Sequence, residues 1–267
     1  MNIVTIVQAR MDSTRLPNKV IMSLAGKPLL IRQIERIKAS YETGTIVVAT
    51  STDSSDDRII EICLQNNIAV FRGDKFDLLD RHYKAAVLHN ADAVVKIPSD
   101  CPLIDPGIIS KVINYYKSNQ NLYDYVSNLH PATYPDGNDV EIFSMEVLEN
   151  AWLNATKNFE REHTTPFIWE NPDKFRVGNV VWESGLNYSM THRWTIDYEE
   201  DYLMIKTVYD ELYHDGNIFS MVDILNLLDR KPHISRINQK YVGVNWYRHH
   251  LKELMTIKPE WTKVIDE

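Results

Sequence analysis

The chain has 267 residues, a hydrophobic content of 44% and a charged content of 25%, values typical of a globular protein with a substantial core. Its formal net charge of −8 argues against a general nucleic-acid-binding protein, which would present a basic surface. The two cysteines lack metal-ligand spacing, no apolar run reaches the length of a membrane span, and the chain starts with a strand rather than a secretion signal. We therefore expect a cytoplasmic protein with reduced thiols, without nucleic-acid partners and without membrane insertion.

Strand-like and helix-like segments alternate through the first half of the chain. Short β-branched runs predict strands, and the segments between them have helical periodicity. The expected strands are 2–7, 45–50, 68–71 and 91–97, and the expected helices are 28–39, 51–67, 76–89 and 106–117. This order predicts an α/β fold with a mainly parallel sheet flanked by helices.

Beyond residue 118 the alternation loosens. Strands are expected at 123–127 and 140–143, separated by a turn-rich loop and followed by two helical segments. The segments Phe175–Trp182 and His192–Ile196 look like a small antiparallel pair that would shape a substrate site, and helices are expected from residue 199 onward. The chain has no internal repeat or Gly/Ser-rich linker, so we predict a single domain.

Three cations follow the first predicted strand. Arg10, Arg15 and Lys19 lie in a loop that also contains Ser13 and Thr14. Ligands of an open parallel sheet bind outside the carboxyl ends of its strands, so these side chains should converge on a ligand. Guanidinium groups pair with phosphate through two hydrogen bonds and lysine adds a point charge, which suits a polyphosphate. The chain contains neither GxxxxGK[ST] nor GxGxxG, which excludes P-loop and dinucleotide sites.

Two aspartates follow predicted strands, and the first is a candidate metal ligand. Asp100 follows the strand at 91–97, at the same edge of the predicted sheet as the cationic loop, and one or two carboxylates suffice for Mg²⁺. A turn cap before Pro102 explains Asp100 equally well. Asp197 precedes a predicted helix, where capping alone would account for it. Cys101, beside Asp100, has no histidine nearby in sequence and fits a buried structural thiol.

The opening loop resembles a known family. QARMDSTRLPNKV (8–20) followed by LAGKPLL (24–30) is similar to the triphosphate-binding loop of nucleotide-sugar cytidylyltransferases, especially the SpsF-like branch of spore-coat polysaccharide biosynthesis. Relatives of that branch make CMP-activated ketodeoxyoctonate and sialic acids. The resemblance covers roughly residues 1–240, with further motifs at 71–86, 98–106, 133–143, 160–166 and 192–201.

The resemblance implies a Rossmann-like, GT-A-like nucleotidyltransferase domain at 1–240. Its nucleotide-binding half would be about 1–120 and its acceptor-binding half about 121–240, followed by a C-terminal helical tail at 241–267. The implied nucleotide-binding residues are Gln8, Ala9, Arg10, Ser13, Arg15, Lys19, Arg72, Asp80, Arg81 and Ser99. The implied catalytic residues are Arg10, Arg15, Lys19 and Asp100, and the implied Mg²⁺ ligands are Asp100 and Asp197.

Two later segments resemble acceptor-binding elements of the SpsF-like branch. TYPDGNDVEIF (133–143) contains Asp139 and Glu141, and FEREHTTPFIWENP (159–172) contains Arg161, Glu162 and His163. Carboxylates and hydroxyls can bind the hydroxyls of a sugar, and arginine can bind an anionic group. From the residues alone, a β-turn and a solvated helical face remain open for these segments.

The aromatic tail VGVNWYRHHLKEL (242–254) is where the resemblance is weakest. His249 and His250 have no carboxylate or cysteine at ligand spacing, so we interpret the tail as packing or as a subunit contact, which would suit a homodimer.

The expected function is that of a Mg²⁺-dependent cytidylyltransferase. It would transfer CMP from CTP to an acidic sugar or a small phosphorylated or phosphonate acceptor, releasing pyrophosphate, in surface polysaccharide or related cell-envelope biosynthesis. The alternatives are a GT-A-like glycosyltransferase that uses a nucleotide sugar and a non-catalytic nucleotide-sensing protein. The arginine-rich loop favours a free triphosphate, and neither a loop cation nor a metal-binding aspartate is missing. The preference for cytosine rests on the resemblance, and no general base is assigned.

Overall fold

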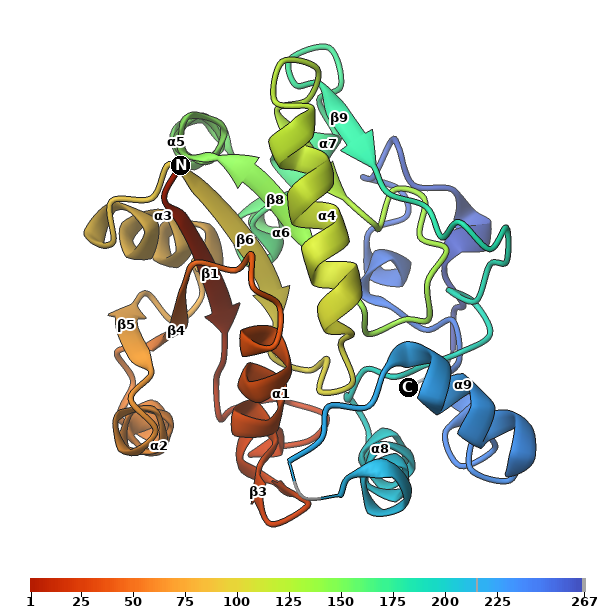
Figure 1. The fold of residues 1–267 in the computed structure, drawn as a ribbon. Coiled ribbons are helices and arrows are strands. Elements are labelled where there is room, and N and C mark those ends of the chain that lie inside the picture. Colours follow the sequence, from red (N-terminus) through yellow and green to blue (C-terminus); the bar gives the residue numbers. More distant parts are fainter. Residues whose placement is uncertain (215, 266–267) are drawn as a thin grey trace.

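A seven-stranded sheet with helices on both faces forms the centre of the molecule (Figure 1). The computed structural model describes residues 1–214 and 216–265. The strand order in the sheet is β5-β4-β1-β6-β8-β7-β9. The strands are β1 (Ile3–Gln8), β4 (Thr45–Ser51), β5 (Ala69–Gly73), β6 (Ala93–Pro98), β7 (Tyr125–Ser127), β8 (Glu141–Ser144) and β9 (Val177–Asn179).

The sheet is mainly parallel, which confirms the predicted fold class. β1 pairs in parallel with β4 and β6, and β4 pairs in parallel with β5. β8 is antiparallel to both of its neighbours, β6 and β7. Because β8 runs the opposite way, its first residue, Glu141, lies at the edge where β1 and β6 end, and it pairs there with Lys96. The sheet therefore brings residues from both halves of the chain to one edge.

Helices cover the two faces in two groups. The helices are α1 (Leu29–Lys38), α2 (Asp57–Gln65), α3 (Leu78–Leu88), α4 (Pro106–Ser118), α5 (Met145–Asn154), α6 (Asn158–His163), α7 (Pro166–Trp169), α8 (Glu199–Leu212) and α9 (Met221–Arg230). α1, α2, α4, α8 and α9 share one apolar core, and α3, α5, α6 and α7 share the other. Alternate residues of β1 divide between the cores, with Val7 in the first and Ile6 in the second, as the two-residue period of a strand requires.

The start of α4 shows how local sequence sets these elements. Asp105 accepts hydrogen bonds from the backbone N–H groups of Gly107 at 2.7 Å and Ile108 at 3.3 Å, and Pro106 is the first helical residue. This is the predicted cap, which satisfies donors that the helix itself cannot. The second oxygen of Asp105 accepts from the N–H of Met221 at 2.6 Å and so ties α9 to α4.

The first-half strands and helices lie close to their predicted positions, and one later prediction is wrong. Residues 177–179 form β9, which pairs in parallel with β7, whereas residues 192–196, all of them described, form no strand. Periodicity marks an extended segment but does not choose its partner. The small antiparallel sheet consists instead of β2 (Ser23–Leu24) and β3 (Lys27–Pro28). The helix predicted at 51–67 divides into η2 (Ser54–Asp56) and α2.

The predicted helical tail at 241–267 contains no α-helix among its described residues, and the helices described after α9 are short 3-10 turns. These are η3 (Gln239–Tyr241), η4 (Trp246–His249) and η5 (Pro259–Trp261). Leu254 and Ile257 join the second core, so the tail is packed against the domain. Residues 266–267 of the tail segment lie outside the described residues. Within the described residues, no helix combines the length and apolarity needed to cross a membrane.

Candidate active site

The loop that follows β1 is anchored at both ends. The N–H of Met11 donates to Asp56 Oδ1 at 2.7 Å, and the N–H of Asn18 donates to the carbonyl of Met11 at 2.8 Å. Asn18 has a φ of 63°, a left-handed conformation that asparagine tolerates better than most residues. The chain then enters η1 (Lys19–Ile21). This turn returns Lys19 to the edge of the sheet.

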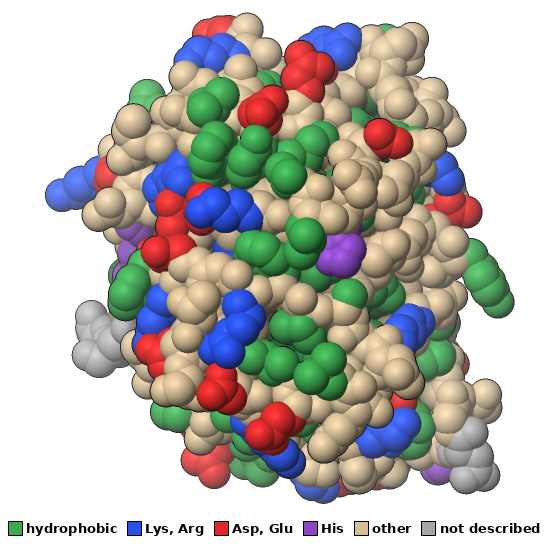
Figure 2. All heavy atoms as spheres, turned by 90° about the vertical axis from the view of Figure 1, so that its left-hand side faces the viewer, with side chains coloured by type: hydrophobic (Ala, Val, Ile, Leu, Met, Phe, Trp, Pro, Cys, Tyr) green, Lys and Arg blue, Asp and Glu red, His purple; other side chains and the backbone are tan. Residues whose placement is uncertain are grey.

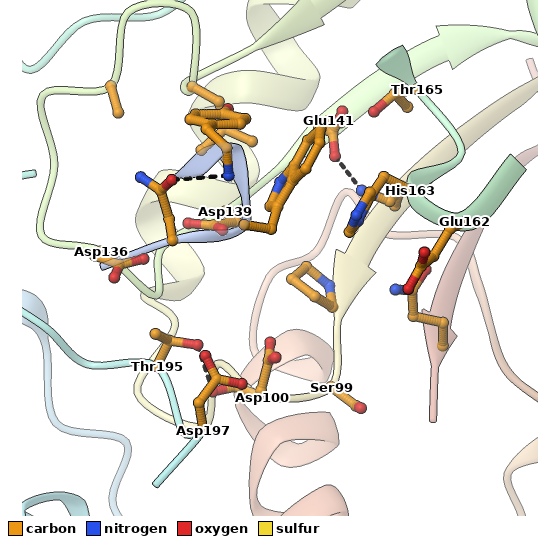
Figure 3. Close-up of a pocket in the computed structure, with 18 of the residues that line it drawn as sticks. Ser99, Asp100, Asp136, Asp139, Glu141, Glu162, His163, Thr165, Thr195 and Asp197 are labelled. Atoms are coloured by element: carbon orange, nitrogen blue, oxygen red, sulfur yellow. Dashed lines mark hydrogen bonds and ion pairs between the residues drawn. The ribbon is translucent and has the colours of Figure 1, made fainter. Parts of the chain in front are cut away.

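Lys19 lies between two aspartates that are far apart in the sequence. Its Nζ is 3.2 Å from Asp100 Oδ2 and 3.2 Å from Asp197 Oδ1, and it donates to the carbonyl of Ile196 at 2.5 Å. A guanidinium nitrogen of Arg15 is 2.8 Å from Asp197 Oδ1. Asp100 follows β6 and Asp197 precedes α8, and Figure 3 shows the two carboxylates side by side. The structure therefore brings together four residues that the sequence analysis selected.

The charges of this cluster stabilise one another. Burial disfavours the charged form of Lys19, but Asp100 and Asp197 outweigh it and raise the pKa of the ammonium group. Burial also disfavours charge on Asp197, yet Lys19, Arg15 and Arg193 lower the pKa of its carboxyl group. Lys19 and Asp197 are thus both charged at neutral pH, next to a solvent-accessible cavity.

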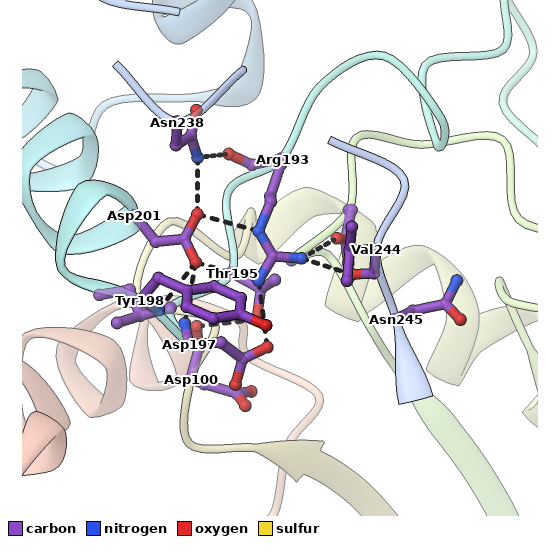
Figure 4. Close-up of polar contacts among 12 residues, drawn as sticks. Asp100, Arg193, Thr195, Asp197, Tyr198, Asp201, Asn238, Val244 and Asn245 are labelled. Atoms are coloured by element: carbon purple, nitrogen blue, oxygen red, sulfur yellow. Dashed lines mark hydrogen bonds and ion pairs between the residues drawn. The ribbon is translucent and has the colours of Figure 1, made fainter. Parts of the chain in front are cut away.

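A buried network behind Asp197 holds it in place (Figure 4). Arg193 donates to Asp201 from Nε at 2.9 Å and from Nη2 at 3.0 Å, and its Nη2 is also 3.0 Å from Asp197 Oδ2. Asp201 accepts from the N–H of Asp197 at 3.0 Å and from Asn238 Nδ2 at 2.9 Å. Arg193 also donates to the carbonyl of Val244 at 2.6 Å. One arginine thus connects Asp197 to the C-terminal tail.

The sequence analysis missed Arg193, although a signal was present. In the segment 193–197, the polar residues Arg193, Thr195 and Asp197 alternate with Trp194 and Ile196, both of which are fully buried. Such alternation places three polar side chains on one side of an extended segment even without strand pairing. Arg193 and Thr195 line the same cavity as Asp197.

A cavity of about 1220 Å³ extends from the Lys19 cluster across the edge of the sheet (Figure 3). This exceeds the roughly 300–1,000 Å³ of a typical small-molecule pocket, so it has room for two substrates. The predicted nucleotide-binding residues that line it are Gln8, Ala9, Arg10, Ser13, Arg15, Lys19, Arg81 and Ser99. All five predicted acceptor-binding residues also line it, namely Asp139, Glu141, Arg161, Glu162 and His163.

Two predicted nucleotide-binding residues are not among the described residues that line the cavity. Arg72 donates to the carbonyls of Ser51 and Asp53, each at 3.0 Å, and so fixes the end of β4. Asp80 accepts from Trp152 Nε1 at 2.9 Å on the outer side of α3. Both side chains have structural contacts that account for them.

Two other predicted residues line the cavity but are held by protein contacts. Arg81 is buried and donates to the carbonyls of Asp74 at 2.6 Å and Lys75 at 2.9 Å, which shapes the loop before α3. Arg161 pairs with Asp77, with Nη2 to Oδ2 at 2.5 Å. These arginines therefore position cavity walls and do not present free charge.

Further acidic side chains line the cavity close to Asp100. Glu141 is buried, forms an ion pair with Lys96 and accepts from the Tyr125 hydroxyl at 2.7 Å. Burial alone would raise the pKa of Glu141, but Lys96 outweighs it and lowers this pKa. Burial and the nearby Asp100 raise the pKa of Asp139 to about 6.

Five aromatic rings form a continuous wall of the cavity beside these acids. His163 stacks on Trp246 with ring centroids 3.8 Å apart, and Trp246 contacts Tyr247 at 4.7 Å. Trp169 lies 6.2 Å from both of these tail rings and 4.5 Å from His130. We call His130, His163, Trp169, Trp246 and Tyr247 the aromatic wall. The sequence analysis interpreted the tail as packing or a subunit contact and gave it no place in the cavity.

Comparison with known proteins places the chain in a family. A model of the family described as "Cytidylyltransferase" matches residues 4–259. The chain belongs to this family. The match includes the loop after β1, Asp100, Asp197 and most of the tail.

Relatives of this cytidylyltransferase chain agree with the predicted branch. It is 36% identical over 241 residues to an uncharacterized protein of Methanocaldococcus jannaschii, covering 89% of this chain and 95% of that one. It is 29% identical to the spore coat polysaccharide biosynthesis protein SpsF of Bacillus subtilis, covering 86% and 95%. A solved cytidylyltransferase of Leptospira borgpetersenii superposes with a TM-score of 0.82 at 33% identity, covering 88% of this chain and 97% of that one.

The carboxylates of Asp100 and Asp197 fit the requirements of a Mg²⁺ site. Both lie within 3.2 Å of the same cationic nitrogen of Lys19, so the space between them already favours positive charge. Mg²⁺ is usually bound by one or two protein carboxylates together with waters and substrate phosphates. No cluster of three or more His, Cys, Asp or Glu side chains suited to a metal occurs among the described residues. Cys101 is fully buried, and burial raises the pKa of its thiol well above the usual value, as expected for a structural cysteine.

Proposed function

We propose that the protein transfers CMP from CTP to a small acceptor and releases pyrophosphate. The observation that carries this proposal is the meeting of Arg15 and Lys19 with Asp100 and Asp197 at the end of β1 and β6. Membership of the cytidylyltransferase family supports CTP as the nucleotide. The likeness to SpsF supports surface polysaccharide or related cell-envelope biosynthesis as the setting.

The transfer needs little covalent work from the protein. An acceptor oxygen forms a bond to the α-phosphorus, and the bond from that phosphorus to the oxygen bridging to the β-phosphate breaks. Pyrophosphate leaves with the electron pair of the broken bond. Arg10, Arg15 and Lys19 would hold the triphosphate and stabilise the charge that develops on the leaving group. Fixing both substrates in one cavity supplies the positioning that the reaction requires.

Asp100 and Asp197 would hold a Mg²⁺ ion. When bound, it would supply Lewis-acid polarisation of the phosphate oxygens. The protein's own part is to keep Asp197 ionised and to direct its carboxylate. Lys19 and Arg15 keep Asp197 ionised, and the Arg193–Asp201 network directs its carboxylate.

The acceptor would occupy the end of the cavity lined by Asp139, Glu141, Arg161, Glu162 and His163. A phosphorylated or phosphonate acceptor presents an oxygen that is already anionic, so no general base is needed for it. An attacking sugar hydroxyl would have to lose its proton, and a bound metal ion could promote this loss. The homodimer and the cytoplasmic location stay predictions.

The test is a pyrophosphate-release assay with each NTP, Mg²⁺ and a panel of acidic sugars, phosphates and phosphonates. We expect release with CTP and its loss in EDTA. Arg15→Ala and Asp100→Asn should lower turnover by roughly 10²–10³-fold, the usual cost of removing a group that stabilises transition-state charge. Arg58→Ala is the matched control, because Arg58 pairs with Glu61 on the exposed surface of α2.

Circular dichroism would confirm that each variant is folded. Wild-type turnover in folded Arg15→Ala or Asp100→Asn protein would refute the assignment. Activity confined to the hydrolysis of nucleotide sugars would favour a glycosyltransferase instead.

A further inference from the structure

The kind of acceptor can be inferred from the part of the cavity that the aromatic wall lines. There the aromatic wall and the acids Asp136, Asp139 and Glu141 line one cavity. Figure 3 shows one ring of the wall, His163, in the same cavity as these acids. Tyr247 lies close enough to these acids that, together with its burial, they raise the pKa of its hydroxyl well above the usual value. Rings and carboxylates therefore line the same space.

The cations at this end are already paired. Lys96 is bound to Glu141, and Arg193 is bound to Asp201 at 2.9 Å. Burial lowers the pKa of His163 to about 3 and that of His130 to about 4, so both rings are neutral at neutral pH. A ligand carboxylate placed against the aromatic wall would thus find neutral rings and paired cations, apart from Arg10, whose charge acts on His163 and which the proposed function assigns to the triphosphate.

Two carboxyl groups at the same place are poorly stabilised in their charged form, because burial raises the pKa of Asp139 to about 6 and that of Asp136 well above its usual value. Within the described part of the chain, Asp139 accepts one hydrogen bond, from the N–H of Gly137 at 3.4 Å. Asp136 is 3.5 Å from Arg193, a cation that already serves Asp201 and Asp197. A positive ligand group would favour the ionised form of both acids, and aromatic faces attract cations through their quadrupole.

Two further observations indicate that the aromatic wall is built for a ligand. Nδ1 of His130 is buried and has no hydrogen-bond partner among the described residues, which is costly unless a ligand or water satisfies it. Thr164, which follows His163, is fully buried with φ 72° and ψ −49°, an unfavourable conformation for a β-branched residue. Strain of this kind persists where the surrounding structure fixes a functional side chain, here His163.

We propose that the acceptor is a zwitterion, with an anionic phosphate or phosphonate oxygen at the Asp100–Asp197 end and an ammonium group held by the aromatic wall, Asp136 and Asp139. This inference rests on the proposed cytidylyl transfer and defines its acceptor. The anionic oxygen attacks the α-phosphorus and needs no proton removed. The ammonium group forms no bond in the reaction and serves only for binding.

Matched acceptors test the ammonium group directly. Phosphocholine and 3,3-dimethylbutyl phosphate have the same shape, but only the first is cationic. 2-Aminoethylphosphonate and its N-acetyl derivative form a second pair. With CTP and Mg²⁺, we expect kcat/KM to be at least about tenfold higher for the cationic member of at least one pair. Ketodeoxyoctonate and N-acetylneuraminate should be poorer acceptors than that cationic member.

Binding is measured separately, so that slow chemistry cannot hide the result. Calorimetry on the full chain would compare choline with its neutral isostere 3,3-dimethylbutan-1-ol. Trp246→Leu and Asp139→Asn should each weaken choline binding by about tenfold, whereas Trp246→Phe should retain most of it. Trp152→Leu and Asp173→Asn are the controls, because Trp152 stacks on Tyr83 away from the cavity and Asp173 is exposed.

The outcomes separate this inference from the proposed function. Equal use of the members of both pairs, with equal binding of choline and its isostere, would overturn the ammonium site even if pyrophosphate is released. A preferred acid sugar would do the same. If Trp246→Leu weakened CTP binding instead of acceptor binding, the aromatic wall would be a base-stacking surface and the inference would be wrong. Failure to bind CTP would contradict the proposed function itself.

Discussion

Asp201 offers the sharpest test of how the site is held. It is fully buried in the first turn of α8 and accepts five hydrogen bonds, two from Arg193 and one each from Asn238, the N–H of Asp197 and the N–H of Tyr198. Asp201→Asn keeps the shape of the side chain and replaces one oxygen by an amide nitrogen. Whichever way the amide is turned, its NH₂ group faces at least two donors.

The expected loss of stability follows from these contacts. Removing one partner of a buried ion pair typically costs about 3–5 kcal/mol, because the remaining charge is left without compensation. Arg193 keeps its contact with Asp197 at 3.0 Å, which places Asp201→Asn near the lower end, at about 3 kcal/mol. In either orientation of the amide, Arg193 loses one of its two acceptors on this side chain, and the N–H of Asp197 also loses its acceptor when the nitrogen replaces Oδ2. We therefore expect weaker Mg²⁺ and CTP binding in the protein that remains folded.

Urea unfolding followed by circular dichroism measures this loss. Asp210→Asn is the matched control, since Asp210 lies on the same helix and pairs with Lys206 at the exposed surface. The free energy of unfolding of Asp210→Asn should fall by only about 0.3–0.5 kcal/mol. If Asp201→Asn lost less than about 1 kcal/mol, or no more than Asp210→Asn, the buried network would not be what holds Asp197 in place.

Two further predictions concern buried groups that support the cavity. Burial lowers the pKa of His82 from 6.5 to about 3, so the unfolded chain binds a proton that the folded chain rejects, and stability falls as pH drops below 6.5. Between pH 6.5 and 5, the free energy of unfolding of wild type should fall by about 2 kcal/mol more than that of His82→Gln. The control His233→Gln, which changes an exposed histidine, should follow wild type. Parallel pH curves for wild type and His82→Gln would contradict this prediction. Asp56 accepts from the N–H of Met11, so Asp56→Asn should displace the loop after β1 and raise the KM for CTP about tenfold, unlike the exposed Asp57→Asn. An unchanged KM in Asp56→Asn would show that the loop does not depend on this contact.

The sequence was sufficient for most of the first half of the fold. Strands such as β1 and β6 are β-branched runs, and caps such as Asp105 satisfy helix donors locally, so short stretches determine these elements. The sequence was insufficient for the segment 192–196, whose alternation suggested a strand. There Arg193 is drawn into contacts with Asp201 and Val244, which local periodicity does not reveal.

The candidate site divides in the same way. Parallel strands end at one edge of a sheet, so Lys19 and Asp100 could be expected to meet from the sequence alone. The role of the tail could not be predicted from the sequence, because Trp246 reaches His163 only after the chain has folded back over the second core. The contacts of Arg72 and Asp80 could not be predicted either, because a charged residue within a family motif looks the same in the sequence whether it faces a ligand or a neighbouring group of the protein.

By itself, the sequence determined the order of strands and helices in the first half of the chain, the presence of a cationic loop, and the two aspartates that follow predicted strands. The tertiary structure alone decided which distant segments share the cavity: the antiparallel β8 brings Glu141 beside Lys96, and Arg193 joins Asp197 to the tail at Val244. The physical reason is that capping and periodicity act over a few residues. Ion pairing and ring stacking in a buried space depend on where separate segments of the chain finally pack.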